Sequence, residues 1–308
     1  MKTIRYTIIA LIAFMFVAGA SHAEALYGTA TGLGEGFGES SLYMINPDTG
    51  EATLIGPIGF DNVTAMAFLG DGRLVGSANG DNDFGSQTSL LIEIDKTTGA
   101  GSLIGIIGQS FNGECGRVPG LTYDPNRNIL YGYGDACDGN DLLLTINTQT
   151  GKGTIIGPTR FSSGGNGLAW DPRSGRLFAT PADDNTLVLI NPVTALGRSI
   201  TPSGVVPDMM RSLAIQPPTY VLYGALKDRD SVFGAENLSY LTTIDMVTGA
   251  TTVVGESVLG LDGLIFEPGP FFVPEFPIPT LSEWGLIAMA GVLGIIGLLA
   301  IRRRKATV

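Results

Sequence analysis

Histidine is almost absent from this 308-residue chain, and its single copy, His22, lies close to the N-terminus. Serine–histidine–aspartate and cysteine–histidine nucleophiles, histidine general bases and most zinc sites all need an imidazole. The sequence downstream of His22 therefore excludes these classes of enzyme and metal site.

Cysteine is almost as scarce, because Cys115 and Cys137 are the only two in the chain. In an oxidising compartment such a pair is expected to form one disulfide. Cys115 precedes the first strand of a predicted β-hairpin and Cys137 follows the second, so they lie at neighbouring ends of that hairpin. The sequence predicts a disulfide between them.

Positive charge is also in short supply. The chain has 18 lysines and arginines against 29 aspartates and glutamates, for a formal net charge of −11. Lys2, Arg5 and the cluster 302–305 account for six of these cations, so the segment between the two ends is more acidic still. Because binding to a phosphate backbone requires a basic face, we expect no nucleic-acid partner.

No helical periodicity of useful length occurs between the two ends, where a β-hairpin recurs instead. Each copy is a strand, an Asn/Asp-x-x-Thr-Gly turn and a second strand, and four turns end in Gly50, Gly99, Gly151 and Gly249. A glycine at this position suits a backbone with positive φ. Copies begin near residues 42, 91, 143 and 241, and a weaker one near 187 lacks the glycine.

A second hairpin alternates with the first, as in Gly120-Leu-Thr-Tyr-Asp-Pro125 and Gly167-Leu-Ala-Trp-Asp-Pro172. Its fifth copy is divided between residues 261–267 and the strand that begins at Ala25. Five units of four strands, the last completed by both ends of the segment, predict an all-β fold, a five-bladed β-propeller closed by its terminal strands. The predicted blades are 63–108, 118–158, 165–204, 210–255, and 261–267 with 25–56. Two small β-sandwiches are the alternative.

The N-terminus has the pattern of a secretory signal peptide, residues 1–23. Lys2 and Arg5 are followed by an apolar run from Ile8 to Ala20 and by small residues before a predicted cleavage site after Ala23. The apolar run is short for a membrane span of about 20 residues. We therefore expect the chain to be exported.

The C-terminus has the pattern of a membrane-spanning sorting signal. Residues 284–301 carry no charge and are followed by three arginines and Lys305. Such a segment is long enough to cross a bilayer as a helix, with the basic cluster on the cytoplasmic side. Residues 268–277, rich in proline and phenylalanine, are expected to form a stiff spacer between it and the propeller at 24–267.

Residues 278–308 combine a short motif, the apolar segment and the terminal basic cluster, and together they resemble the IPTL-CTERM protein-sorting domain. The motif residues are Ile278, Pro279, Thr280, Leu281, Trp284 and Gly285. The resemblance implies that a membrane-embedded exosortase, expected to be of type H, reads the motif and removes the helix. It implies a cell-envelope, cell-surface or extracellular location after transient anchoring in the inner membrane. The remaining repeat resembles generic extracellular propellers only at the level of fold.

Acidic side chains gather in the long segments predicted on one face of the propeller. Asp81, Asp83, Asp138 and Asp141 place carboxylates at short spacing, which calcium prefers as ligands, although neither segment has the EF-hand pattern. Solvated loops and paired carboxylates for glycoside hydrolysis are the alternatives. We therefore expect a non-enzymatic surface or matrix module that binds glycan, protein or calcium. A carboxylate-dependent glycosidase or lyase is the alternative.

Overall fold

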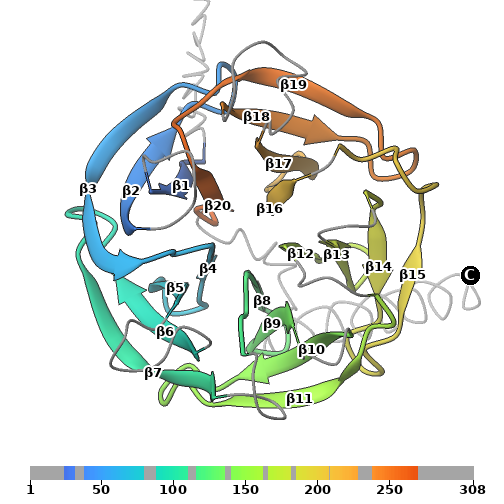
Figure 1. The fold of residues 1–308 in the computed structure, drawn as a ribbon, viewed down its shortest axis with the longest axis horizontal. Coiled ribbons are helices and arrows are strands. Elements are labelled where there is room, and N and C mark those ends of the chain that lie inside the picture. The colour runs from blue at the N-terminus through green and yellow to red at the C-terminus, as the bar shows by residue number, and fades with distance from the viewer. Residues whose placement is uncertain are drawn as a thin grey trace, which may run out of the picture. The chain divides into compact units, whose positions relative to one another are not determined.

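In a computed structural model of the protein, the described residues form twenty β-strands. The structure describes residues 24–31, 38–79, 88–109, 116–135, 140–161, 166–181, 185–207, 209–227 and 238–269. The strands pair into five four-stranded antiparallel sheets. Figure 1 shows them as blades around a central axis, with β4, β8, β12, β16 and β20 innermost. The prediction of an all-β, five-bladed propeller is confirmed.

The blades are numbered one to five along the chain, and within each the strands follow one another from the innermost to the outermost. Blade one comprises β4 (Ala65–Phe68), β5 (Leu74–Asn79), β6 (Thr88–Ile94) and β7 (Gly101–Gln109). Blade two comprises β8 (Gly120–Asp124), β9 (Ile129–Asp135), β10 (Asp141–Ile146) and β11 (Gly153–Pro158). Blade three comprises β12 (Gly167–Asp171), β13 (Arg176–Thr180), β14 (Val188–Ile190) and β15 (Gly197–Ser199). Blade four comprises β16 (Met210–Gln216), β17 (Val221–Lys227), β18 (Ser239–Ile244) and β19 (Thr251–Glu256).

Blade five closes the ring with strands from both ends of the described segment. It comprises β20 (Leu261–Phe266), β1 (Leu26–Ala30), β2 (Glu39–Ile45) and β3 (Ala52–Asp61). Tyr27 of β1 pairs with Ile265 of β20 in an antiparallel register. Closure of this kind leaves no blade without a neighbour on either side.

The outer hairpin of each blade is shaped by an Asx turn. In blade two, the Asn147 carboxamide oxygen accepts hydrogen bonds from the backbone N–H of Gln149 and Thr150, at 2.9 and 3.0 Å. The turn ends at Gly151, whose φ is 75°. The equivalent Gly50, Gly99 and Gly249 have φ values of 81, 84 and 73°, so the prediction of positive φ at all four glycines is confirmed.

A second recurrent glycine, in the outermost strand, joins neighbouring blades. A Cβ atom added to Gly105 in β7 would overlap the carbonyl oxygen of Thr150, which lies in the outer turn of blade two. Gly56 and Gly255 have the same relation to the turns of blades one and five. The backbone of each outer strand therefore packs directly on the next blade's turn, which only glycine permits.

Blade three departs from this pattern, as its weaker repeat suggests. Its outer turn carries Ala195 at a φ of 60°, where the other four blades have glycine. A Cβ at Gly157, which faces this turn, would lie 3.4 Å from the Ala195 Cβ, an ordinary contact. The two outer strands of this blade are only three residues long.

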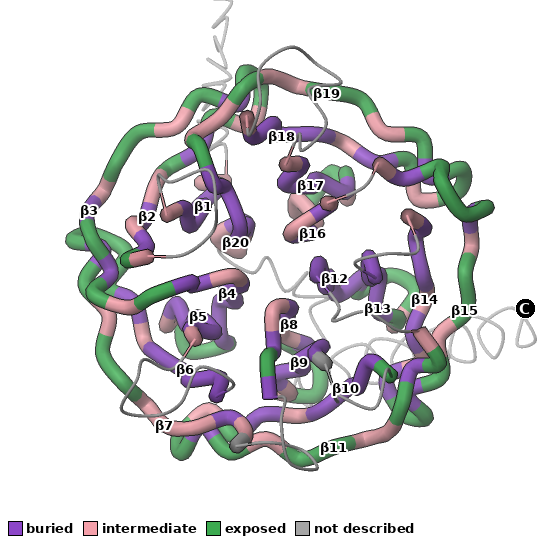
Figure 2. Tube along the Cα trace, in the orientation of Figure 1, coloured by how far each residue is buried: buried purple, intermediate pink, exposed green. Residues whose placement is uncertain are grey.

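The hydrophobic core lies between blades as well as within them. One cluster joins Tyr131 and Leu143 of blade two to Trp170 and Leu177 of blade three, and four similar clusters occupy the other junctions. Figure 2 shows long buried stretches in the inner and middle strands, while the outermost strands are mostly intermediate or exposed. Side chains also bridge the innermost strands, since the Ser212 hydroxyl of β16 accepts the N–H of Leu264 in β20, at 3.0 Å.

Candidate functional site

The innermost strands present polar side chains at both of their ends. We call the end with the inner hairpin turns, at 69–73, 124–129, 171–176 and 216–221, the turn face. The opposite end, where each innermost strand begins, is the loop face, and residues 64, 119, 166, 211 and 262 occupy the same repeat position there.

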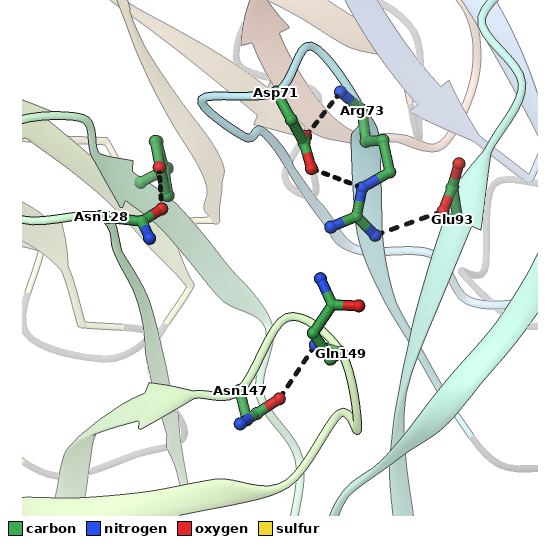
Figure 3. Close-up of polar contacts among 7 residues, drawn as sticks. Asp71, Arg73, Glu93, Asn128, Asn147 and Gln149 are labelled. Atoms are coloured by element: carbon green, nitrogen blue, oxygen red, sulfur yellow. Dashed lines mark hydrogen bonds and ion pairs between the residues drawn. The ribbon is translucent and has the colours of Figure 1, made fainter.

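On the turn face, arginines are paired with aspartates of the same turn. The Arg173 backbone N–H and Nε–H donate to Asp171 at 3.1 and 3.2 Å, and Arg127 Nη1 donates to Asp124 at 2.9 Å. Figure 3 shows the equivalent contacts of blade one, where Arg73 bonds Asp71 at 2.8 Å and Glu93 at 3.4 Å.

The pKa of Asp171 reflects this bonding. Burial raises the pKa of the carboxyl, but hydrogen bonds from Ser174 and Arg173, together with the charge of Arg173, outweigh burial. The pKa of Asp171 therefore lies below its ordinary value, and the ionised form stabilises the turn. These carboxylates belong to the architecture of the turns.

Aromatic rings on the turn face are covered by the same arginines. The Arg127 guanidinium lies 5.7 Å from the centre of the Trp170 ring, and Tyr131 stacks on that ring at 6.2 Å. Arg173 lies 4.3 Å from the ring centre of Tyr220 in the next blade. Trp170 is only 7% exposed, so it packs between blades and offers no open ring face to a ligand.

The loop face holds a different pair of charges, Arg211 in β16 and Asp262 in β20. Arg211 Nε lies 3.9 Å from an Asp262 oxygen, too far for a hydrogen bond. The Arg211 Nε–H is buried and has no hydrogen-bond partner. Asp262 is 7% exposed, whereas the Arg211 side chain keeps 29% of its surface exposed. The pair is therefore accessible through Arg211.

Both residues occupy β-bulges. In β16, Met210 pairs with Leu226 and Ser212 with Ala225, which leaves Arg211 as the extra residue. In β20, Leu261 and Gly263 pair with successive residues of β1, which leaves Asp262 as the extra residue. Bulges redirect side chains and are frequent beside functional sites. Two neighbouring blades thus present opposite charges through the same local distortion.

The pKa of Asp262 is shifted in the opposite direction from that of Asp171. Burial raises the pKa of Asp262, and the positive charges of Arg211 and Lys227 lower it only in part. The pKa of Asp262 therefore lies above its ordinary value, with burial as the largest cause. A buried carboxylate with a raised pKa and a buried N–H donor without a hydrogen-bond partner are features of a binding or catalytic site.

Of the four predicted calcium ligands, the structure describes Asp141. This residue is completely buried, and its carboxylate accepts a hydrogen bond of 2.6 Å from Tyr133 Oη. In blades five and one the same repeat position is Ser40 and Ser89, whose hydroxyls accept backbone N–H groups of the next inter-blade connection, at 2.9 and 2.8 Å. Asp141 thus replaces a serine that ties blades together.

The other three predicted calcium ligands, Asp81, Asp83 and Asp138, lie outside the described residues. Within the described part of the chain, no three Asp, Glu, Cys or His side chains come together as a metal ion would require. The calcium site stays a prediction.

The predicted disulfide and both termini also lie outside the described residues. This holds for Cys115 and Cys137, for the signal peptide 1–23 and for the apolar segment 284–301. Among the residues the structure does describe, no helix is sufficiently long and apolar to span a membrane.

Comparison with known proteins identifies the C-terminal signal. The IPTL-CTERM motif matches residues 276–304. The chain therefore carries an IPTL-CTERM motif at its C-terminal end. The match contains the six predicted motif residues, from Ile278 to Gly285, and implies an exported, cell-surface protein that is processed by an exosortase.

The part of the chain that precedes this motif resembles solved structures in fold alone. A chain in the crystal structure of a nidogen/laminin complex superposes with a TM-score of 0.51 at 14% identity, over 79% of this chain and 98% of that one. A structural genomics protein of unknown function from Bacteroides thetaiotaomicron gives 0.48 at 16% identity, over 80% and 61% of the two chains. Hydrazine synthase of Kuenenia stuttgartiensis gives 0.41 at 15%, over 64% and 49%. None of the curated proteins is similar enough in sequence to count as a relative.

The Arg211–Asp262 pair was not among the site residues predicted from the sequence. The repeat nevertheless contains a signal for this pair. The position before the inner-strand motif is uncharged in three blades, whereas in the adjacent blades four and five it is Arg211 and Asp262, which have opposite charges. Alignment of the five repeats could therefore have indicated the pair. The bulges that make both residues extra to the strand pairing are visible only in the structure.

Proposed function

We propose that the chain is an exosortase-sorted surface propeller that binds an extracellular ligand at its loop face without cleaving it. The observation that supports this proposal most is the arrangement of the described carboxylates along the innermost strands. Asp124 and Asp171 are bonded within their own turns on the turn face, and Asp262 stands at the loop face beside Arg211.

This arrangement disfavours the glycosidase alternative. Asp262 lies five positions before Glu267, which has the same repeat position as the turn-face aspartates, and at about 3.3 Å per residue this is roughly 16 Å. Glycoside hydrolysis requires two carboxyl groups about 5 to 9.5 Å apart. The turn-face carboxylates are therefore too far from Asp262 to complete such a pair.

The deciding experiment follows binding and cleavage together. The full chain, purified in mild detergent, would be mixed with the exopolysaccharide of the cells that produce it, and both retention and new reducing ends would be recorded. We expect retention without new ends. Reducing ends that form with the parent chain and disappear with Asp262→Asn would contradict the proposal and establish a hydrolase.

Calcium is tested in the same assay by adding a chelator. If the predicted ligands Asp81, Asp83, Asp138 and Asp141 hold an ion that supports the loop face, the chelator should release the polysaccharide, and added calcium should restore binding. Asp81→Asn should then have the same effect as the chelator. Binding that is indifferent to the chelator would contradict a calcium role in ligand binding.

Sorting is proposed to proceed in two cuts. The signal peptide 1–23 is removed after Ala23, and the helix 284–301 holds the chain in the inner membrane until an exosortase of type H cuts near the motif. The IPTL-CTERM match supports the second step. Pro279→Ala should leave the uncut chain in the membrane fraction, whereas Pro274→Ala in the spacer should be processed normally, as mass spectrometry of the exported product would show.

A further inference from the structure

The Arg211–Asp262 pair combines a buried N–H donor that has no hydrogen-bond partner with a carboxylate that contacts it only as a long ion pair. The Arg211 Nε–H is buried without an acceptor, and the Asp262 carboxylate meets the guanidinium only at 3.9 Å. Leaving a buried charged group without hydrogen bonds is costly, because its interaction with water has been given up. A ligand that supplies the missing bonds would recover this free energy.

The 3.9 Å separation fits a single oxygen atom between the two groups. Hydrogen bonds measure about 2.9 Å from nitrogen to oxygen and about 2.7 Å between oxygens, so one atom can lie within bonding distance of both. That atom must donate to Asp262 and accept from Arg211. A hydroxyl does both, whereas the N–H and C=O of a trans amide point in opposite directions.

The local charges and the hydrogen-bond donor that Asp262 requires together favour a neutral ligand group. A cation placed between the two groups would meet Arg211 and Lys227, and an anion would meet Asp262. An uncharged polyol is repelled by neither side. A calcium ion is therefore disfavoured by the two positive charges, and a ligand carboxylate has no proton to donate to Asp262.

We propose that Asp262 and Arg211 bind a hydroxyl group of a neutral glycan, which donates a hydrogen bond to the Asp262 carboxylate and accepts one from the Arg211 Nε–H. The inference rests on the proposed function, since it names the ligand class of the binding module. The paired bulges support it, because blades four and five alone, among the described strand registers, have an extra residue at this repeat position in the innermost strand. Part of the Arg211 side chain is exposed next to its buried Nε, so a ligand hydroxyl would approach the pair along this side chain.

The test uses the full chain in mild detergent with immobilised dextran and mannan as neutral glycans, polygalacturonate as an acidic glycan and gelatin as a polypeptide. We expect binding to at least one neutral glycan. Asp262→Asn and Arg211→Gln should each weaken it by about tenfold or more, because each removes a hydrogen bond to a charged group. Asp171→Asn and Arg173→Gln are matched controls from the turn face and should stay within about twofold of the parent in affinity.

Near-ultraviolet circular dichroism would confirm that each variant is folded, and Arg211→Gln provides an independent reading if Asp262→Asn is not. Undiminished neutral-glycan affinity in the folded variants would overturn the inference. Binding only to polygalacturonate or gelatin, or no binding to either neutral glycan, would also overturn it. Failure of the proposed function has a separate signature, which is the release of reducing ends.

Discussion

The two ends of the innermost strands carry similar residues in different chemical states. On the turn face, Asp171 and Arg173 are joined by hydrogen bonds of 3.1 and 3.2 Å, and the pKa of the carboxyl is lowered. On the loop face, Asp262 and Arg211 are 3.9 Å apart, and the pKa of the carboxyl is raised. Both aspartates are almost fully buried. Asp171 is therefore part of the structure of its turn, whereas Asp262 makes no such close bond and is the carboxylate that we propose for ligand binding.

The largest expected change in the free energy of unfolding tests whether close packing on the turn face stabilises the fold. Gly105→Ala would drive a Cβ into the carbonyl oxygen of Thr150, which belongs to an outer turn on this face. We expect a loss of about 3 kcal/mol in the free energy of unfolding, as for overpacking against rigid backbone. Thermal denaturation would measure it.

Gly157→Ala is the matched control for this substitution. Its new Cβ would meet the Ala195 Cβ at 3.4 Å, so the loss should stay below about 1 kcal/mol. Equal losses of unfolding free energy in the two variants would contradict the claim that the glycine at this position is needed for close packing on the next blade's turn. Ligand affinity of the folded fraction should be unchanged in both.

The next effect in size concerns the bonded pair itself. Asp171→Asn should lower the free energy of unfolding by about 2 kcal/mol at pH 7, because a charge-assisted hydrogen bond in a buried turn is lost. Since the pKa of Asp171 is lower in the folded chain, its contribution is present above the unfolded pKa and is lost as the pH falls. The difference from the parent should therefore shrink towards pH 3 in urea titrations.

An exposed aspartate controls for the change of charge alone. Asp48 is exposed in the outer turn of blade five, and Asp48→Asn should change stability by less than about 0.5 kcal/mol. A penalty for Asp171→Asn that does not depend on pH would contradict the role given to its ionised form.

The smallest expected effect is a gain in the free energy of unfolding, whereas the substitutions above cause losses. The pKa of Asp262 is higher in the folded chain, so its contribution to stability is present below the unfolded pKa and is lost as the pH rises through the folded pKa. Asp262→Asn removes this loss and should raise the free energy of unfolding by about 1 kcal/mol at pH 7. In acid the variant and the parent should converge. Destabilisation at pH 7 would show that the carboxylate is already satisfied in the folded chain.

The repeat predicted the fold because each blade encodes its own turns. The Asx residue and the positive-φ glycine recur at fixed spacing, and hairpins of this kind form from local chemistry. The weak copy near residue 187 also corresponds to a structural difference, because Ala195 occupies the positive-φ position where the other four copies have glycine.

The candidate site could not be predicted in the same way. Arg211 and Asp262 lie in different blades, and two bulges and the closing of the ring bring them together. The acidic pattern that includes Asp141 suggested a calcium ligand, which stays a prediction, and the pattern gave no sign that this carboxylate is buried and accepts a hydrogen bond from Tyr133. Residue type and spacing alone do not distinguish a bonded carboxylate from an available one.

The most direct test of this difference between the two faces is to measure the carboxyl pKa values of Asp171 and Asp262 by NMR on isotopically labelled chain, with and without saturating neutral glycan. We expect the pKa of Asp262 to lie above its ordinary value of 3.8 in the free chain and to fall when a ligand hydroxyl donates to the ionised form. The pKa of Asp171 should lie below 3.8 and stay unchanged. A low pKa for Asp262 in the free chain, or one that saturation leaves unmoved, would contradict the claim that the two ends differ in this way.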